Sequence, residues 1–375
     1  MFKEYSEKNH TELSALTIIQ GGGTVKREDS DRNLMYDTSN LSNYKMVRKD
    51  DFIVHLRSFE GGLEKSSLDG IISPAYHTFH SDMADSRFYY PYFRSYEFIK
   101  HKLVSHVYGI RDGRSIDIDG MKTIEIPYTS IEEQRKIGDY LDCLEHLITL
   151  HQRKCEQTKN LKKYMLQKMF PQNGAKVPEI RFNGFTHDWE QRKLGDMGST
   201  FTGLTGKTKE DFGHGDAQFI TYMNVFSNPV ANLEMTEAVE IDAKQNRVKK
   251  GDVFFTTSSE TPEEVGMSCV MPENKDNIYL NSFCFGYRPT EKFDLDYLAY
   301  VLRADSFRKE MTFLAQGISR YNISKNKVME VSIPFPNLEE QTMVGRYFST
   351  LDNLITLHQR QTDFYKKSNF YFISS

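Results

Sequence analysis

Apolar residues recur at alternating spacings of four and three in two separate stretches of the chain. Such spacing places side chains on one face of a helix, so each stretch predicts an amphipathic helix. A seam of this kind favours a partner helix, and each stretch can serve as the partner of the other. The seam residues are Ile137, Leu141, Leu144 and Ile148 in the first stretch and Val344, Phe348, Leu351 and Ile355 in the second.

The two predicted helices begin with the same signals. Each follows a short β-type run closed by proline, TIEIP in the first case and EVSIP in the second. Ser130 and Asn337 suit the N-cap, and Glu133 and Glu340 follow three residues later, as in a capping box. The run PQNG after Met169 ends the first helix. A helix of about 33 residues spans roughly 50 Å, longer than a small domain needs, which also favours helix pairing.

The chain contains an internal duplication. The word LITLHQR occurs at 147–153 and again at 354–360, an offset of 207 residues (354 minus 147). The same offset relates the flanking IP and EEQ motifs, whereas MVRKDDFIV at 46–54 and RVKKGDVFF at 247–255 are related by 201 residues. The helical parts therefore match closely and the remainder diverges. If the copies are related by a pseudo-twofold axis, the paired helices run antiparallel; two separate core helices are the alternative.

The two divergent bodies each show short β-type runs with Gly, Pro and Asn between them. Helical stretches are predicted near 90–107 in the first body and near 296–313 in the second. Each body is therefore predicted as a mixed α+β domain. The predicted organisation is a first domain at 1–128, a helical region at 129–176, a second domain at 177–336 and a distal helical region at 337–375.

Charge and cysteine content narrow the class of protein. The formal net charge is −4, so a nucleic-acid site would have to come from local groups of Lys and Arg. The four cysteines form no CxxC pair, which is typical of a reducing cytosol. The charged N-terminus lacks the apolar core of a signal peptide, and no apolar run is long enough for a membrane span. These features predict a cytoplasmic protein without a membrane segment.

Polar and basic residues gather at the predicted loops of both bodies. Such side chains can hydrogen-bond base edges and phosphates, although ordinary solvated loops have the same composition. The candidate DNA-binding residues are Arg57, Ser58, Arg111 and Arg114 in the first body and Ser258, Ser259, Glu260, Ser319, Arg320 and Asn322 in the second.

No catalytic or metal site is predicted. FTGLTGKT ends like a phosphate-binding loop, but Phe201 stands where that motif requires glycine. Asp242 and Lys244 have the spacing of a nuclease D-x-K motif, yet no upstream acidic partner is identifiable. His151 and His358 occupy equivalent positions on the helix seam, where a polar residue that fixes register is favoured over a metal ligand.

Four motifs together resemble the specificity subunit of Type I restriction-modification systems. They are the IP(Y/F)xxxEEQ step into a long helix, the repeated LITLHQR, LKKYMLQKMF at the end of the first helix, and PEIRFNGFTHDWEQRKLGD at 178–196. The resemblance implies an α+β fold with two pseudo-twofold-related target-recognition domains, joined by two long helices in an antiparallel coiled coil. Each domain would read one half of a split sequence in double-stranded DNA.

The same resemblance implies that chemistry takes place in partner subunits. The seam helices would dock DNA adenine methyltransferase subunits, and ATP-dependent restriction/translocase subunits would join them. No cofactor is expected in this chain; S-adenosylmethionine, ATP and Mg²⁺ are expected in the partners. A stand-alone nuclease or methyltransferase, a coiled-coil adaptor, and a truncated non-functional remnant are the alternatives.

The sequence departs from this family pattern at two places. The offset of 207 residues would put a counterpart of 178–196 before residue 1, so the first recognition domain is expected to lack its opening segment. The final YKKSNFYFISS differs from LKKYMLQKMF, so the second helix is expected to end early.

Overall fold

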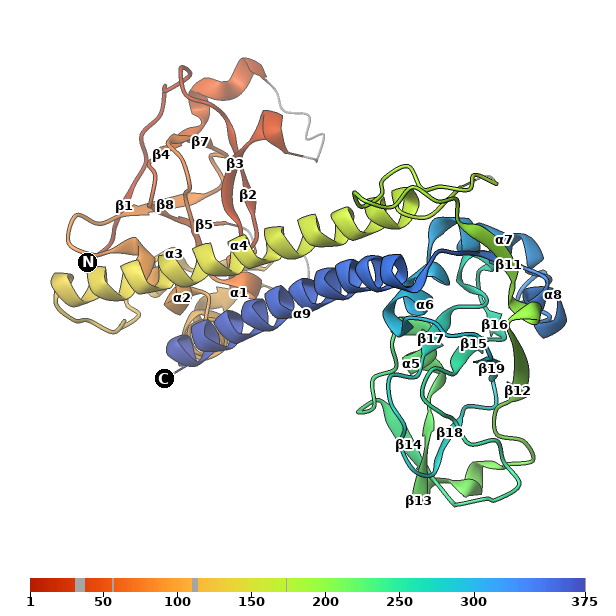
Figure 1. The fold of residues 1–375 in the computed structure, drawn as a ribbon. Helices are drawn as coiled ribbons and strands as arrows, with labels where there is room; N and C mark the ends of the chain where they lie inside the picture. The colour runs from red at the N-terminus through yellow and green to blue at the C-terminus, as the bar shows by residue number, and fades with distance from the viewer. Residues whose placement is uncertain (31–37, 56, 110–113, 173, 375) are drawn as a thin grey trace. The chain divides into compact units, whose positions relative to one another are not determined.

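The computed structural model describes residues 1–30, 38–55, 57–109, 114–172 and 174–374 (Figure 1). The candidate Arg111 lies outside these residues. The chain forms two compact units: the first comprises 1–152 with 359–375, and the second comprises 153–358. The long helices α4 (Ile131–Lys168) and α9 (Leu338–Ser374) each contribute to both units.

The first unit is built on a four-stranded antiparallel sheet with the strand order β1-β8-β5-β6. The two-stranded pairs β2-β3, β4-β7 and β9-β10 accompany it. The elements are β1 (Lys3–Tyr5), β2 (Leu16–Ile19), β3 (Gly23–Lys26), β4 (Lys45–Val47), β5 (Phe52–Val54), α1 (Ser58–Gly61), β6 (Glu64–Lys65), β7 (Gly70–Ile72), β8 (His77–His80), α2 (Ser86–Phe93), β9 (Val107–Tyr108), β10 (Ser115–Ile116) and α3 (Ile118–Met121).

The second unit contains a sheet of the same form, in the order β12-β19-β15-β17. A three-stranded sheet β14-β13-β18 and the pairs β11-β21 and β16-β20 complete its strands. The elements are β11 (Glu190–Lys193), β12 (Gly198–Thr202), β13 (Phe212–Ile220), α5 (Tyr222–Ser227), β14 (Thr236–Val239), β15 (Val253–Thr256), β16 (Ser258–Ser259), β17 (Ser268–Val270), β18 (Ile278–Leu280), β19 (Cys284–Pro289), α6 (Leu295–Val301), α7 (Asp305–Leu314), β20 (Tyr321–Asn322), α8 (Lys325–Met329) and β21 (Ser332–Phe335).

The repeat seen in the sequence is present in the bodies of both units. The central strands β5 and β15 are apolar and fully buried, because the sheet is covered on both faces. Phe52 faces Phe79 across the first sheet, and Val253 faces Tyr287 across the second. These central strands belong to the motifs that the offset of 201 residues aligned.

Each body attaches to the start of its long helix by the same hydrogen bonds. A buried glutamine on the helix accepts a backbone N–H from the residue that caps a body helix, and a buried tyrosine donates to the carbonyl of the preceding proline. The distances are Asp85 N to Gln134 Oε1 3.0 Å and Tyr89 Oη to Pro127 O 2.8 Å in the first unit, and Asp294 N to Gln341 Oε1 3.1 Å and Tyr297 Oη to Pro334 O 2.7 Å in the second. The attachment is therefore duplicated as well as the helix.

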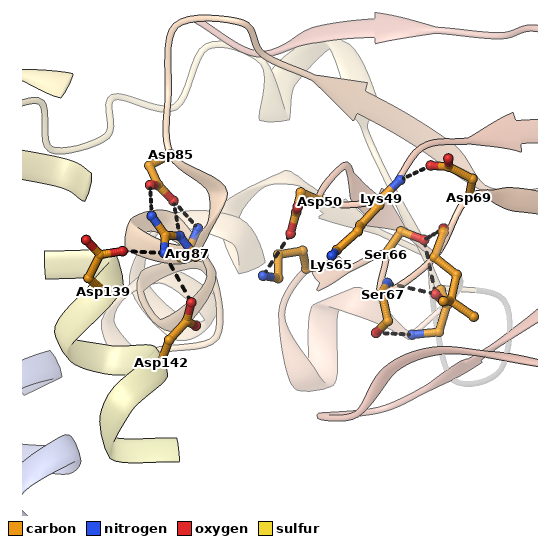
Figure 2. A network of polar contacts seen from close by, with 12 residues as sticks. Lys49, Asp50, Lys65, Ser66, Ser67, Asp69, Asp85, Arg87, Asp139 and Asp142 are labelled. Atoms are coloured by element: carbon orange, nitrogen blue, oxygen red, sulfur yellow. Dashed lines mark hydrogen bonds and ion pairs between the residues drawn. The ribbon is translucent and has the colours of Figure 1, made fainter. Parts of the chain in front are cut away.

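Arg87 adds an ionic attachment in the first unit, and Figure 2 shows it between the body and α4. Its guanidinium donates to Asp85 at 2.7 and 3.0 Å, and to Asp139 and Asp142 on α4 at 2.6 and 3.2 Å. These hydrogen bonds, that to Asp85 foremost, raise the pKa of Arg87. Gly138 permits the close approach, since a Cβ there would lie 3.1 Å from the Arg87 Cβ.

The predicted N-caps of the long helices are confirmed. Ser130 Oγ accepts the Glu133 backbone N–H at 3.3 Å, and Asn337 Oδ1 accepts that of Glu340 at 2.9 Å. The predicted capping box is wrong for Glu340, because its carboxylate is buried against Arg181 and Trp189 instead.

The ends of the predicted helices are confirmed in part. Helix α4 ends at Lys168, as expected, whereas α9 continues to Ser374 and does not end early. The stretch near 90–107 is not one helix: α2 ends at Phe93, and a π-helix over Glu97–Lys102 and a short 3-10 turn follow. The stretch near 296–313 is divided into α6 and α7.

Five of the eight seam residues are buried. Val344, Phe348 and Leu351 lie in the main apolar cluster of the second unit, and Leu141 and Leu144 are buried in the first. Their burial does not fit the docking role predicted for these five residues. Ile137, Ile148 and Ile355 are half-buried.

The two long helices also contact each other within the second unit. Cys155 Sγ lies 3.9 Å from the Ile355 carbonyl oxygen, and Lys162 pairs with Asp352 at 2.6 Å. The residue number rises along α4 as it falls along α9, so the helices run in opposite directions here. A heptad coiled coil along their whole length stays a prediction.

Candidate nucleic-acid interface

A polar cleft of about 660 Å³ opens on the second unit. Three segments line it: the start of α5, the loop after β15, and the loop before β20. Its lining residues are Tyr222, Met223, Phe226, Ser258, Ser259, Glu260, Glu264, Ser319 and Arg320. Five of the predicted DNA-binding residues therefore meet in one place, although more than fifty residues separate the two loops in sequence.

A short strand pair holds the two predicted loops together. Ser258 pairs with Asn322, the sixth candidate of this unit, and Ser259 pairs with Tyr321. Asn322 and Gln316 exchange backbone hydrogen bonds of 2.8 and 2.9 Å, which close the loop between them. Ile318 at the tip of this loop is 96% exposed. The loop therefore extends into solvent on a fixed base.

Asn224 fixes the helical wall of the cleft. Its side chain is fully buried and donates to the carbonyls of Asn232 and Met235 at 2.7 and 2.9 Å. Its Oδ1 accepts the Asn232 backbone N–H at 3.0 Å and the Asn228 amide at 3.1 Å. Thr221 caps the same helix by accepting the Asn224 N–H. These bonds position Tyr222, Met223 and Phe226.

Two buried arginines support the loops behind the cleft. Arg303 donates to four backbone carbonyls, three of which belong to the segment 225–228 that includes the wall residue Phe226. Arg308 donates to the carbonyls of Glu263, Val265 and Gly266 at 2.6 to 2.8 Å. Burial lowers the pKa of each arginine to about 10, so both stay charged at neutral pH. The cleft therefore has a rigid base.

The lining of the cleft offers both donors and acceptors. Arg320 supplies a guanidinium, for which the described residues provide no ion pair. Glu264 accepts the hydroxyls of Thr261 at 3.1 Å and Ser259 at 3.3 Å, and Glu260 adds a second carboxylate. Two carboxylates beside one arginine disfavour binding through phosphates alone. The mixture suits the edges of base pairs, since each pair presents both donors and acceptors in the major groove.

The predicted DNA-binding residues of the first unit do not line a common cleft among those described for it. Ser58 is fully buried and its Oγ accepts the His55 backbone N–H at 2.9 Å, so this residue is structural and the prediction of a DNA contact does not fit it. Arg57 is exposed at the start of α1, and Arg114 lies over the Phe59 ring at 5.4 Å. Two arginines thus remain near α1.

Sequence reasoning missed the aromatic wall of the polar cleft. Tyr222 and Phe226 stack with ring centroids 6.1 Å apart, and the Tyr222 hydroxyl donates to the Ser258 carbonyl at 2.7 Å. In sequence these residues resemble core positions. The signal that could have found them is Thr221, an N-cap residue followed at once by aromatic and polar residues.

The possible nuclease motif has a structural role. Asp242 accepts the Lys244 backbone N–H at 3.0 Å, hydrogen-bonds Gln245 and pairs with Lys207. These bonds, in that order, lower its pKa to about 2, as expected of a carboxylate that stabilises a turn. Across the described part of the chain no group of His, Cys, Asp and Glu has a metal-binding arrangement, and no helix is long and apolar enough to cross a membrane.

Several known proteins resemble this chain in sequence. Residues 186–363, which include every lining residue, match the Type I restriction modification DNA specificity domain. The MjaVIII specificity subunit of the Type I restriction enzyme from Methanocaldococcus jannaschii is 25% identical over 267 residues, 68% of this chain and 61% of the relative. The MjaIX specificity subunit is 23% identical over 48% of this chain and 41% of the relative.

Solved structures share the fold over almost the whole chain. The HsdS subunit from Thermoanaerobacter tengcongensis aligns with a TM-score of 0.51 and 18% identity over 99% of this chain and 93% of its own. The S subunit from M. genitalium aligns with a TM-score of 0.55 and 13% identity over 100% and 95%. The chain spans less than two thirds of the length of the curated relatives named above. The chain is therefore similar over residues 186–363 to the Type I restriction modification DNA specificity domain, and over nearly its whole length it shares the fold of the solved S subunits.

Proposed function

We propose that this chain is the non-catalytic subunit that selects the DNA sequence for a restriction and adenine-methylation complex. The second unit reads one half of a split target in double-stranded DNA through the polar cleft, and the first unit reads the other half. The observation that carries this proposal is the meeting of Ser258, Ser259, Glu260, Ser319 and Arg320 in one cleft inside the matched domain. Such a protein acts in the cytoplasm, where it meets the chromosome.

We further propose that DNA adenine methyltransferase subunits dock on the long helices. Support comes from apolar side chains that the helices leave exposed in the second unit: Leu354 on α9 is 39% exposed, Leu357 48%, and Leu161 on α4 41%. Exposed apolar residues grouped on a helix are typical of a protein interface. ATP-dependent translocase subunits would join this core, and S-adenosylmethionine, ATP and Mg²⁺ would bind in the partners.

Mapping methylated adenines tests the reading role. Co-expression with a methyltransferase subunit of the same operon should give one split methylated motif, and Arg320→Ala should relax or lose one half of that motif while the other half is kept. A base-edge contact of an arginine is worth about 1–3 kcal/mol, roughly a 5- to 150-fold loss at the affected half-site. Arg247→Ala, an exposed arginine of the same unit outside the cleft, is the matched control.

The outcome separates base reading from other roles. If Arg320→Ala weakens methylation equally at every motif, Arg320 contacts the backbone of DNA and reads no base. If the motif is unchanged, the cleft is not the reading site. Purified chain alone, without partners, should neither cut nor methylate DNA.

A size measurement tests the docking role. The double variant Leu354→Asp, Leu357→Asp should lose the methyltransferase subunit in size-exclusion chromatography with light scattering, because a charge in an apolar interface is costly. The double variant Asn353→Asp, Thr356→Asp adds the same two charges at exposed polar positions of the same helix and is the matched control, which should keep the complex. Full complex formation by the leucine double variant would exclude this face.

A further inference from the structure

The loop that borders the polar cleft carries one apolar side chain at its tip. Ile318 is 96% exposed, the highest value for a large apolar side chain among the described residues, and Ser319 and Arg320 directly after it line the cleft. A single exposed apolar residue is common on protein surfaces and indicates no site by itself. What sets Ile318 apart is the fixed loop that holds it beside a cleft of hydrogen-bonding groups.

The backbone of this loop is fixed on both sides of Ile318. Gln316 and Asn322 exchange backbone hydrogen bonds at its base. Gly317 has a φ of +151°, and a Cβ at this position would lie 2.1 Å from the Arg320 carbonyl oxygen. The chain therefore doubles back more closely than a side chain at 317 would allow. A side chain on such a preformed loop loses little backbone freedom when it binds, so Ile318 is already presented to whatever enters the cleft.

Because DNA enters the polar cleft in the proposed function, on which this inference rests, the groove that faces the cleft decides what Ile318 can contact. Glu260 and Glu264 in the lining need hydrogen-bond donors. In the minor groove the base edges present acceptors, with the guanine amino group as the one donor, whereas every base pair offers a donor in the major groove. The two carboxylates therefore favour the major groove.

Thymine supplies the apolar partner in the major groove. Its 5-methyl group lies among the donors and acceptors of the base edges, and apolar side chains contact it in protein–DNA complexes. Ile318 and Arg320 are two positions apart, at most about 7 Å of chain, and stacked base pairs are about 3.4 Å apart. We propose that Ile318 reads the 5-methyl group of a thymine in the half-site of the second unit, within about three base pairs of the pair that Arg320 contacts.

Deoxyuridine in place of thymine tests the proposal, because it removes the 5-methyl group and keeps the hydrogen-bonding groups of the base pair. The complex of the full chain with its methyltransferase subunit is titrated onto fluorescein-labelled duplexes that carry the methylated motif, and fluorescence anisotropy measures binding. Each thymine of the motif, on either strand, is replaced in turn. One replacement should weaken binding by about three- to fivefold, as expected for the loss of one buried methyl group.

Substitution of Ile318 assigns that methyl contact to its side chain. Ile318→Ala should bind the thymine duplex about as weakly as the unaltered complex binds the deoxyuridine duplex, and the replacement should then cause no further loss. The variant should fold normally because Ile318 is exposed, and circular dichroism checks this. Ile241→Ala is the matched control, since Ile241 is an isoleucine of the same unit that is 50% exposed and lies outside the lining of the cleft. It should keep the full response.

Four results would overturn the proposal. The first is the lack of a response to any deoxyuridine, and the second is a response that Ile318→Ala retains, because another side chain such as Met223 would then read the methyl group. The third is equal weakening of Ile318→Ala on every duplex with no deoxyuridine response, as for a wedge between base steps. The fourth is loss of the methyltransferase subunit from Ile318→Ala in light scattering, which would make the loop a protein contact.

A scrambled duplex separates failure of this inference from failure of the proposed function. A complex that prefers its motif over the scrambled duplex still reads DNA, so any of the four results then refutes the role of Ile318 alone. A complex without that preference refutes the reading role and, with it, the role of Ile318.

Discussion

A charged pair in the first sheet predicts that the first unit is sensitive to pH and the second is not. Asp51 is 1% exposed and accepts hydrogen bonds from Tyr5 Oη and from His80 Nδ1, the latter at 2.5 Å. In the second sheet the equivalent Asp252 accepts from Arg288 Nε at 2.7 Å and Nη2 at 2.6 Å. One unit thus pairs its buried carboxylate with a titratable base, and the other with a permanent cation.

The direction of the pH effect follows from the pKa of His80. Its hydrogen bond to Asp51 raises the pKa above 6.5, and Asp82 at 3.0 Å adds to the effect against partial burial. A base with a raised folded pKa contributes its stability fully below the unfolded pKa of 6.5, and this contribution is lost as pH rises through the folded value. The first unit should therefore lose stability as the pH rises above about 6.5, where Tyr5 stays neutral because burial raises its pKa.

Solvent screening limits how much stability the Asp51–His80 pair contributes. His80 is 38% exposed, so screening reduces the interaction toward that of a surface ion pair, about 0.5–1 kcal/mol. This corresponds to a two- to fivefold change in the amide protection of β5. His80→Arg should give Asp51 a permanent cation, as Arg288 gives Asp252, and should remove the pH dependence. His80→Gln should also remove it, because the amide protection of β5 would then be low at acidic pH as well.

Hydrogen exchange with mass spectrometry measures both units in one sample. Protection factors of the peptide that contains β5 should fall as the pH rises above about 6.5 in the unaltered chain, and those of the peptide with β15 should not. Normalisation to intrinsic exchange rates removes the trivial pH effect. If His80→Arg retains the full decrease in β5, the Asp51–His80 pair is not its cause and the reasoning is refuted.

Three further substitutions test the frame of the second unit by urea denaturation, followed through the fluorescence of Trp189. Asn224→Ala removes four buried hydrogen bonds and should destabilise this unit by about 2–4 kcal/mol, with a lower urea midpoint. Arg303→Met leaves four carbonyls without their donor and should cost about 3 kcal/mol or more. Gly345→Ala places a Cβ 2.5 Å from the Tyr297 N and should cost about 1–3 kcal/mol. An unchanged midpoint in any of them contradicts the contact assigned to that residue.

The sequence predicted those features that depend on local signals. Ser130 and Asn337 cap the long helices because a cap needs only its own first turn. The internal repeat also predicted two bodies of one type, which the matching sheet orders confirm. Pairing of α4 with α9 was expected from the seam, and the Lys162–Asp352 contact agrees with opposite helix directions in the second unit.

Predictions that depended on distant contacts were less successful. Glu340 matched a capping box, yet Arg181 and Trp189 from more than 150 residues away bind its carboxylate. Phe348 matched a helix seam, but it stacks on Phe170 in the core of its own unit. Local spacing gives the face on which a residue lies and cannot identify what covers that face.

The same difference between local signals and distant contacts applies to the candidate site. The polar residues at both loops were found from composition, since donors and acceptors on loops are needed to read bases. Their meeting in one cleft depends on the β16–β20 pair and on Arg303, which no local pattern marks. Ser58 shows how composition alone can mislead. It is a polar residue in a predicted loop, yet it is fully buried and its Oγ accepts the His55 backbone N–H.

The two units share the attachment of the body to its long helix, but they differ in the loops that form the polar cleft. Gln134 and Gln341 make the same bond to the body helices, so the attachment of body to helix is constant across the repeat. The polar cleft is formed by segments that follow β15 and precede β20, and these have no close counterpart among the described strands of the first unit. A constant attachment allows the loops to change without moving the domain on its helix. The proposed reading role, in which the two halves of one target need different contacts, requires this separation, whereas an adaptor role does not.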